Sequence, residues 1–127
     1  MGKRFFTLQQ ARAALPPIRA LAGKLIQVRN DLDRFQPLAS ELAAQAAFNS
    51  GGPEATAYFD RVMLLHELVS KIEEFGCHVK NAQEGLLDFP HLMDGREVYL
   101  CWRFGEDDIS YWHEVDAGFS GRTPIVE

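Results

Sequence analysis

The sequence predicts an α+β fold in which a long N-terminal antiparallel helical hairpin packs on a small C-terminal antiparallel β-sheet. Two stretches repeat apolar residues at alternating intervals of three and four, which is the spacing of packed helices. Beyond Gly76 the pattern changes to short runs rich in aromatic and β-branched residues, which is typical of strands. We therefore expect the hairpin over residues 7–76 and the β unit over residues 77–127, within one domain of 127 residues.

A capping-box pattern marks the start of the first helix. The side chains of Thr7 and Gln10 can each accept a hydrogen bond from the backbone N–H of the other residue. Pro16 disfavours helical geometry in the residue before it, and Pro17 suits the first turn of a new helix. These positions predict a short helix over residues 8–15, followed by a longer helix from residue 17.

The longer helix carries a heptad pattern of the coiled-coil type. Its apolar positions are Ile18, Leu21, Leu25, Val28, Leu32 and Phe35. Pro37 should kink or break this helix, because proline removes a backbone donor and crowds the preceding turn. Residues 38–48 then resume a helical pattern, and residues 49–52 have the composition of a turn.

A third helix is expected from Pro53 to Phe75, with Gly76 as its C-terminal cap. Its first apolar stripe contains Tyr58, Val62, Leu65, Val69 and Ile72. A second stripe, formed by Leu64, Leu68, Ile72 and Phe75, makes the apolar face too wide for one partner helix. Either the β unit or a second copy of the chain should cover the remainder, so we consider a homodimer through this helix.

Four strands are expected in the β unit, over residues 77–80, 86–89, 96–104 and 109–116. Residues 105–108 suit a four-residue hairpin loop that would pair Phe104 with Ile109. In that register His113 lies on the apolar core face, beside Leu100 and Trp102. The opposite, polar face would then carry Glu97, Tyr99, Cys101, Arg103, Trp112, Glu114 and Asp116.

Composition and charge exclude several classes of protein. The apolar fraction of 46% and the charged fraction of 24% are those of an average globular protein, and the apolar runs are too short to span a membrane. The N-terminus does not form a signal peptide, so we expect a cytoplasmic protein whose two cysteines, Cys77 and Cys101, are reduced thiols. Residues 1–36 carry a net charge of +5 and the remainder −10. The acidic total of −5, without aromatics among the basic residues, argues against nucleic-acid binding.

The segment from His113 to Asp116 contains residue types that can bind a metal ion, but their side chains are not expected to point to the same side of the strand. Alternation along a strand sends His113 to one face and both Glu114 and Asp116 to the other, so these three side chains cannot all reach one ion. The carboxylates of the polar face can form a salt-bridge network with arginine, or a cation or acid/base site. Cys101 shares its expected face with no histidine and therefore lacks a base, which favours a packed thiol.

Several blocks of the sequence resemble a known family. They are Phe6-Thr7-Leu8 with Leu15-Pro16, residues 85–90, residues 95–98, Leu100-Cys101-Trp102, Gly105-Glu106, Ile109, residues 111–114, Gly118-Phe119, and Gly121-Arg122 with Pro124-Ile125. Together they look like the bacterial family catalogued as domain of unknown function 2203, over nearly the whole chain. The resemblance implies no activity, because that family has no established one. It directs attention to the charged residues within or beside these blocks, which are Asp88, Arg96, Glu97, Arg103, Glu106, His113, Glu114 and Arg122.

The leading functional hypothesis is a non-enzymatic module that binds a small anionic ligand or a protein partner on the polar face of the sheet. No complete set of nucleophile, base and orienting group can be assembled. The ligand-binding candidates are Asp88, Arg96, Glu97, Arg103, Glu106, His113, Glu114, Asp116 and Arg122. Two alternatives stay open: a metal-dependent or acid/base enzyme with a carboxylate and histidine site in the same region, and a structural or oligomerisation protein. The sequence assigns no cofactor.

Overall fold

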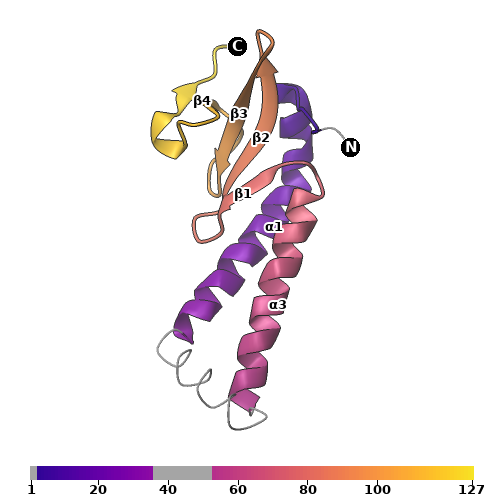
Figure 1. The fold of residues 1–127 in the computed structure, drawn as a ribbon, viewed down its shortest axis with the longest axis vertical. Helices are drawn as coiled ribbons and strands as arrows, with labels where there is room; N and C mark the ends of the chain where they lie inside the picture. The colour runs from indigo at the N-terminus through magenta and orange to yellow at the C-terminus, as the bar shows by residue number, and fades with distance from the viewer. Residues whose placement is uncertain (1–2, 36–52) are drawn as a thin grey trace.

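The computed structural model describes residues 3–35 and 53–127 and confirms the α+β class (Figure 1). The helices are α1 (Leu8–Arg34) and α3 (Pro53–Glu73). The strands are β1 (His78–Asn81), β2 (Leu86–Met93), β3 (Arg96–Arg103), β4 (Tyr111–Glu114) and β5 (Thr123–Pro124), with a 3₁₀ turn, η1 (Phe119–Gly121), before the last. The expectations for residues 36–52, including the kink at Pro37, lie outside the described residues.

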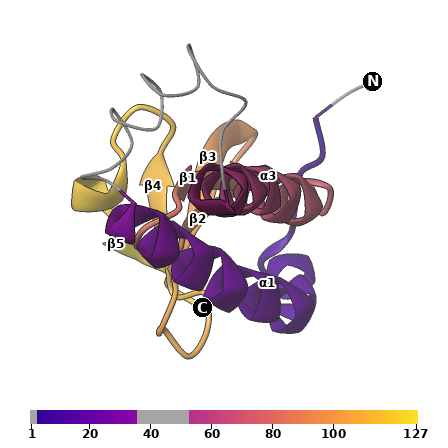
Figure 2. The ribbon, with the colours of Figure 1, turned by 90° about the horizontal axis from the view of Figure 1, so that it is seen from below.

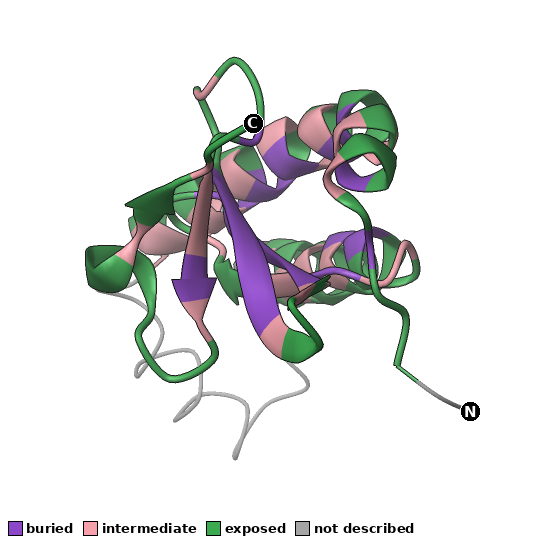
Figure 3. Ribbon diagram, turned by 90° about the horizontal axis from the view of Figure 1, so that it is seen from above, coloured by how far each residue is buried: buried purple, intermediate pink, exposed green. Residues whose placement is uncertain are grey.

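The two helices run antiparallel and cover one face of a single sheet (Figures 1 and 2). All strand pairs are antiparallel, and the order in the sheet is β1-β2-β3-β4-β5. One hydrophobic core joins the helices to the sheet, and the central strands are buried along much of their length (Figure 3). Its largest members include Leu15, Ile18 and Leu25 of α1, Ile72 of α3, and Leu87, Phe89, Leu100 and Trp102 of the sheet. Within the described parts of the chain, no helix is long and apolar enough to cross a membrane.

Helix α1 is continuous, so the expected helix end at Leu15 is wrong. The predicted capping box is present: the Thr7 hydroxyl accepts a hydrogen bond from the Gln10 N–H at 3.0 Å, and the Gln10 amide oxygen accepts one from the Thr7 N–H at 2.9 Å. Pro16 and Pro17 lie inside the helix, whose first turns are bent relative to the rest (Figure 2). Leu15 and Ile18, on either side of the prolines, are buried in the same core, and this shared packing holds the helix together.

The apolar stripe predicted for α1 supplies three of the six buried residues of this helix. Ile18, Leu25 and Val28 are buried, and Leu21 packs against the core at its edge. Helix α3 buries Leu68 and Ile72 but leaves other apolar side chains in solvent, with Phe59 53% exposed and Met63 68% exposed. Phe59 and Met63 lie outside the two stripes predicted for this helix, and within those stripes only Leu64 is exposed, at 37%.

Strands form at all four predicted positions, but the predicted register of the β3–β4 hairpin is wrong by one residue. Tyr99 lies opposite His113, and Leu100 lies opposite Trp112. The connecting loop is longer than a four-residue turn. Within it, the Glu106 carboxylate accepts a hydrogen bond from the Arg103 N–H at 2.7 Å, and the Glu106 carbonyl accepts one from Trp102 Nε1 at 3.1 Å. A shift of one residue turns every side chain of β4 to the other face.

Strand β2 is also longer than expected. It passes through Pro90 to Met93, and Asp94 and Gly95, with φ of 54° and 77°, join it to β3 in a two-residue turn of the type I′ kind. Pro90 is tolerated because β1 pairs only with the first residues of β2. The N-terminal segment lies beside Pro90 instead, and the Phe6 N–H donates to the Pro90 carbonyl at 2.7 Å. Strand β5 was not predicted.

Candidate functional site

The face of the sheet turned away from the helices carries four buried polar or aromatic side chains, which we call the outer-face cluster: Asp88, Tyr99, Cys101 and His113. Asp88 of β2 lies opposite Cys101 of β3, and Tyr99 of β3 lies opposite His113 of β4. These positions alternate with the core residues of the same strands, so they share the opposite face. The cluster is therefore drawn from three adjacent strands of the sheet.

Asp88 and His113 form a buried pair at the centre of this cluster. Asp88 Oδ1 lies 3.0 Å from His113 Nε2, and the two residues are only 3% and 2% exposed. His113 Nδ1 lies 2.6 Å from the carbonyl oxygen of Glu114, so Nδ1 carries a proton and donates it there. One further proton is then shared between Nε2 and the Asp88 carboxyl group. Both ring nitrogens are engaged, which fixes the orientation of the imidazole.

The Cys101 thiol adjoins this pair. One donor atom from each of Asp88, Cys101 and His113 lies within 4.8 Å of the other two. Burial raises the pKa of the Cys101 thiol to about 12, and the nearby Asp88 carboxylate contributes to the increase. The thiol is protonated at neutral pH and is a poor nucleophile in this state. The expectation that no histidine shares its face is wrong, because the corrected register brings His113 to that side.

A pocket of about 270 Å³ opens over the Asp88–His113 pair, which forms its floor. Apolar side chains of Leu86, Val115 and Phe119 contribute to its walls. The remaining lining residues are Lys80, Asp116 and Gly118. The Lys80 ammonium lies 5.2 Å from the centroid of the Tyr99 ring, a cation–π distance. The pocket therefore combines one buried polar pair, an apolar wall and two side chains of opposite charge.

Arg122 holds the segment around Phe119, which lines the pocket, against the sheet. Its guanidinium lies 4.0 Å from the centroid of the Tyr111 ring and 4.5 Å from that of Phe119. Arg122 Nη2 donates to Glu106 Oε1 at 2.7 Å. Arg122 Nε is buried without a hydrogen-bond partner in the described part of the chain. Through these contacts Arg122 connects Phe119, which lines the pocket, to Tyr111 of β4 and to Glu106.

The other residues selected from the sequence lie in ion pairs near the surface. The pairs are Arg96–Glu114 at 2.6 Å, Lys3–Glu97 at 2.6 Å and Arg103–Glu84 at 3.6 Å. Pairs of this kind contribute little to stability. Of the nine predicted candidates, the structure brings Asp88, His113 and Asp116 together at the pocket and places Glu106 and Arg122 beside it.

Sequence reasoning missed Lys80, Tyr99 and Cys101 as members of the site. One signal was available: Asp88 is a lone acid in the apolar run Leu-Leu-Asp-Phe-Pro, from Leu86 to Pro90. A carboxyl group buried in such a strand needs a hydrogen-bonding partner on a neighbouring strand. A search for that partner would select the histidines of the nearby strands β1 and β4, which are His78 and His113.

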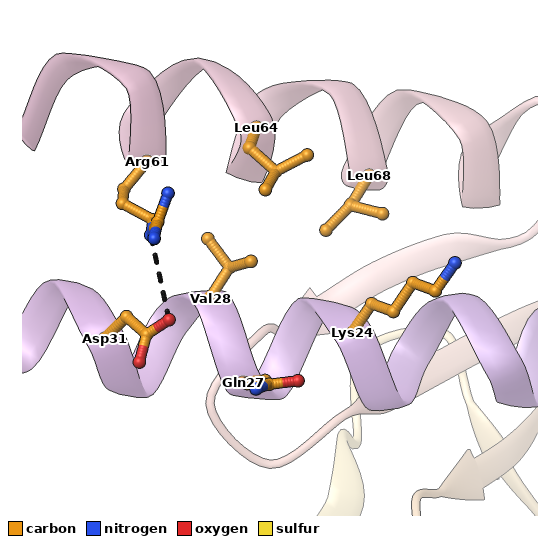
Figure 4. Close-up of a pocket in the computed structure, with 7 residues that line it drawn as sticks. All are labelled: Lys24, Gln27, Val28, Asp31, Arg61, Leu64 and Leu68. Atoms are coloured by element: carbon orange, nitrogen blue, oxygen red, sulfur yellow. Dashed lines mark ion pairs between the residues drawn. The ribbon is translucent and has the colours of Figure 1, made fainter. Parts of the chain in front are cut away.

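A second pocket, of about 280 Å³, lies between α1 and α3 (Figure 4). Val28, Leu64 and Leu68 point into it from the two helices (Figure 4). Asp31 and Arg61 form an ion pair across it at 3.7 Å. It is a cleft of the helix pair without a buried polar pair among its lining residues, and we do not assign the site to it.

Comparison with known proteins gives a family and no activity. A family model described as "Uncharacterized conserved protein (DUF2203)" matches residues 4–125. Searches of curated proteins and of solved structures found no match. Since the family model covers nearly the whole sequence, the chain belongs to the DUF2203 family of uncharacterized conserved proteins, as the sequence blocks predicted.

Proposed function

We propose that this protein is a small-ligand-binding module whose site is the pocket over Asp88 and His113. The observation that carries the proposal is a buried carboxyl–imidazole pair at the floor of a pocket, on the face of the sheet that the helices leave uncovered. Burying such a pair costs desolvation and often stabilises a fold less than apolar residues of similar size would. Its position under a pocket therefore favours recognition of a ligand.

The lining of the pocket suggests the chemistry of the ligand. A volume of about 270 Å³ is at the lower end for ligand sites, so it suits a molecule of few heavy atoms. Lys80 can pair with an anionic group, and the exposed carboxylate of Asp116 can accept a hydrogen bond from a hydroxyl or ammonium group. We therefore propose a small molecule with an anionic group and a hydrogen-bond donor, such as a hydroxy carboxylate or a zwitterionic amino carboxylate.

Binding is favoured over acid/base catalysis by the state of the polar groups. Both nitrogens of His113 already have hydrogen-bonding partners, so neither is free to take a proton from a bound molecule. The Cys101 thiol is protonated, because burial raises its pKa to about 12. The described residues around the pocket therefore lack an activated nucleophile with its base.

The proposal is tested by ligand-observed NMR with glycolate, glycine, acetate and inorganic phosphate as probes. We expect saturable binding of glycolate or glycine, weaker binding of acetate, which has no donor group, and loss of binding in Lys80→Ala. Lys71→Ala is the matched control, because Lys71 is an exposed lysine of α3 that forms an ion pair with Glu67 at 3.2 Å, away from this pocket. Absence of saturable binding for all four probes, or an equal loss in Lys71→Ala, would contradict the proposal.

We also propose that the protein self-associates through α3. The support is that Phe59 and Met63, which are four residues apart and therefore neighbours on one side of this helix, are both exposed. A second copy of the chain would cover both side chains. Light scattering coupled to size-exclusion chromatography should give the mass of a dimer for the wild type and of a monomer for Met63→Glu. A monomeric wild type at all concentrations would remove this proposal.

A further inference from the structure

We infer that Asp88, Cys101 and His113 form a binding site for one divalent transition-metal ion of the zinc class. The three residues lie on β2, β3 and β4, and each is almost completely buried. Their donor atoms, one oxygen, one sulfur and one nitrogen, lie within 4.8 Å of one another. The inference goes beyond the proposed function, because an ion can bind here whether or not the pocket holds an organic ligand.

The separation of the oxygen and nitrogen donors is close to that of two ligands in a tetrahedral site, and the sulfur donor lies within 4.8 Å of both. Zinc lies about 2.0–2.1 Å from oxygen and nitrogen ligands and about 2.3 Å from sulfur, so its ligand atoms are about 3.3–3.8 Å apart. Asp88 Oδ1 and His113 Nε2 are 3.0 Å apart without an ion. An ion between them requires the two side chains to separate by only a few tenths of an ångström. A mixed set of oxygen, nitrogen and sulfur donors favours zinc and its neighbours over Mg²⁺ or Ca²⁺, which prefer oxygen.

The orientation of His113 is the one that metal-binding histidines adopt. Its Nδ1–H donates to the carbonyl oxygen of Glu114 at 2.6 Å, which leaves Nε2 directed at the cluster. A second hydrogen bond of this kind fixes the ring and raises the basicity of the nitrogen that binds the metal. The backbone of β4 therefore already supplies the outer support that a histidine ligand needs.

The exchange of protons for the ion leaves the charge of the cluster unchanged. Without metal, the cluster holds the thiol proton of Cys101 and the one proton shared by Asp88 and His113, and its total charge is zero. Binding of a divalent cation releases both protons to solvent, as the thiolate, the carboxylate and the neutral imidazole each donate an electron pair to the ion. The metal-bound cluster is also neutral, so the ion adds no net charge to a buried site.

The ion would have one coordination position open to the pocket. Asp88 and His113 both line the pocket, so an ion held between them faces the cavity on one side. Three protein ligands with a free fourth position are the arrangement of reactive zinc sites. On the basis of the proposed function, the anionic group of the small ligand would occupy this position.

Cobalt(II) titration of the metal-free, full-length protein tests the inference. We expect one equivalent of Co²⁺ to bind, with visible d–d bands of a tetrahedral complex and a charge-transfer band from one thiolate. Cys101→Ser should lose the charge-transfer band, and Asp88→Asn or His113→Gln should weaken Co²⁺ binding about tenfold or more. Cys77→Ser is the matched control, because Cys77 is also buried and burial likewise raises its pKa to about 12. It should keep the full spectrum.

Three results would overturn the inference: no Co²⁺ bound by the folded wild type, a complex without the thiolate band, or a band that survives in Cys101→Ser. Cadmium NMR of the wild type provides a second measurement if a variant fails to fold, and its chemical shift should indicate one sulfur ligand. A shift without sulfur would also reject the site. Glycolate binding to the metal-free protein is measured separately and depends on Lys80, so failure of the metal site and failure of the pocket are distinguishable.

Discussion

The two faces of the sheet are built from alternate residues of the same strands, yet they differ in chemistry. The inner face presents Leu87, Phe89, Leu100 and Trp102 to the helices and belongs to the hydrophobic core. The outer face presents Asp88, Tyr99, Cys101 and His113, which are buried without joining that core. Burial on the inner face stabilises the fold through apolar area, whereas burial on the outer face keeps polar groups together under a pocket. The inner face therefore stabilises the fold, and the outer face is the one to which we assign ligand binding in our proposal.

The largest expected loss of stability comes from truncating a buried side chain on the inner face of the sheet. Leu100→Ala removes a fully buried side chain from β3 and should lower the free energy of unfolding by about 2–5 kcal/mol. Leu92→Ala is the matched control, because Leu92 is a leucine of β2 that is 49% exposed, and it should cost about 0.5 kcal/mol or less. Urea unfolding measures both. Equal losses in the two variants would contradict the division between core and surface.

A smaller effect is expected from breaking the outer-face pair. Asp88→Ala or His113→Ala leaves the other buried group without its partner, at a cost of about 1–3 kcal/mol each. The double variant should cost less than the sum of the single variants, because both remove the same interaction. A double-mutant cycle by urea unfolding checks this, and strict additivity would show that the two side chains do not interact.

The two buried thiols should make the free energy of unfolding depend on pH in the alkaline range. Burial raises the pKa of Cys77 and of Cys101 to about 12, above the value of about 8.5 in an unfolded chain. As the pH rises, the unfolded state loses these protons first, so the free energy of unfolding should fall between about pH 9 and pH 12. At about pH 9 the expected loss is below about 1 kcal/mol per thiol. Unfolding of Cys77→Ala/Cys101→Ala should depend less on pH over this range, and an unchanged slope would be against the assignment.

The smallest effects are expected at the surface ion pairs. Arg96→Ala and Glu97→Ala should each leave the free energy of unfolding nearly unchanged, because their pairs with Glu114 and Lys3 are largely in solvent. Neither variant should alter binding of glycolate. A marked loss of glycolate binding in either one would extend the site beyond the pocket.

The sequence predicted the fold class, the Thr7 cap and the positions of four of the five strands, because each depends on local residue patterns. Tertiary packing decided what it did not predict. Pro16 and Pro17 stay inside α1, since the core holds the side chains on both sides of them. In the loop before β4, the Glu106 carboxylate accepts hydrogen bonds both from the Arg103 N–H and from Arg122, which lies 16 residues further along the chain and which no local pattern reveals.

Because the predicted register of β3 and β4 was wrong by one residue, the predicted grouping of the site residues was wrong as well. Asp88 and His113 were both selected as candidates, but the predicted register sent His113 to the core face. The observed register places the pair together across β3, with Cys101 beside it. The residues of a site on a sheet can thus be recognised from sequence while their grouping requires the correct pairing of strands.

The most direct test of the account is to map which face of the sheet responds to a ligand. Backbone amide chemical shifts of the ¹⁵N-labelled wild type would be followed during a titration with glycolate. The account predicts saturable shifts at Lys80, His113 and residues 115–119 around the outer-face pocket, with little change at the inner-face strand positions. Shifts confined to the cleft between α1 and α3, around Lys24 and Arg61, would contradict it.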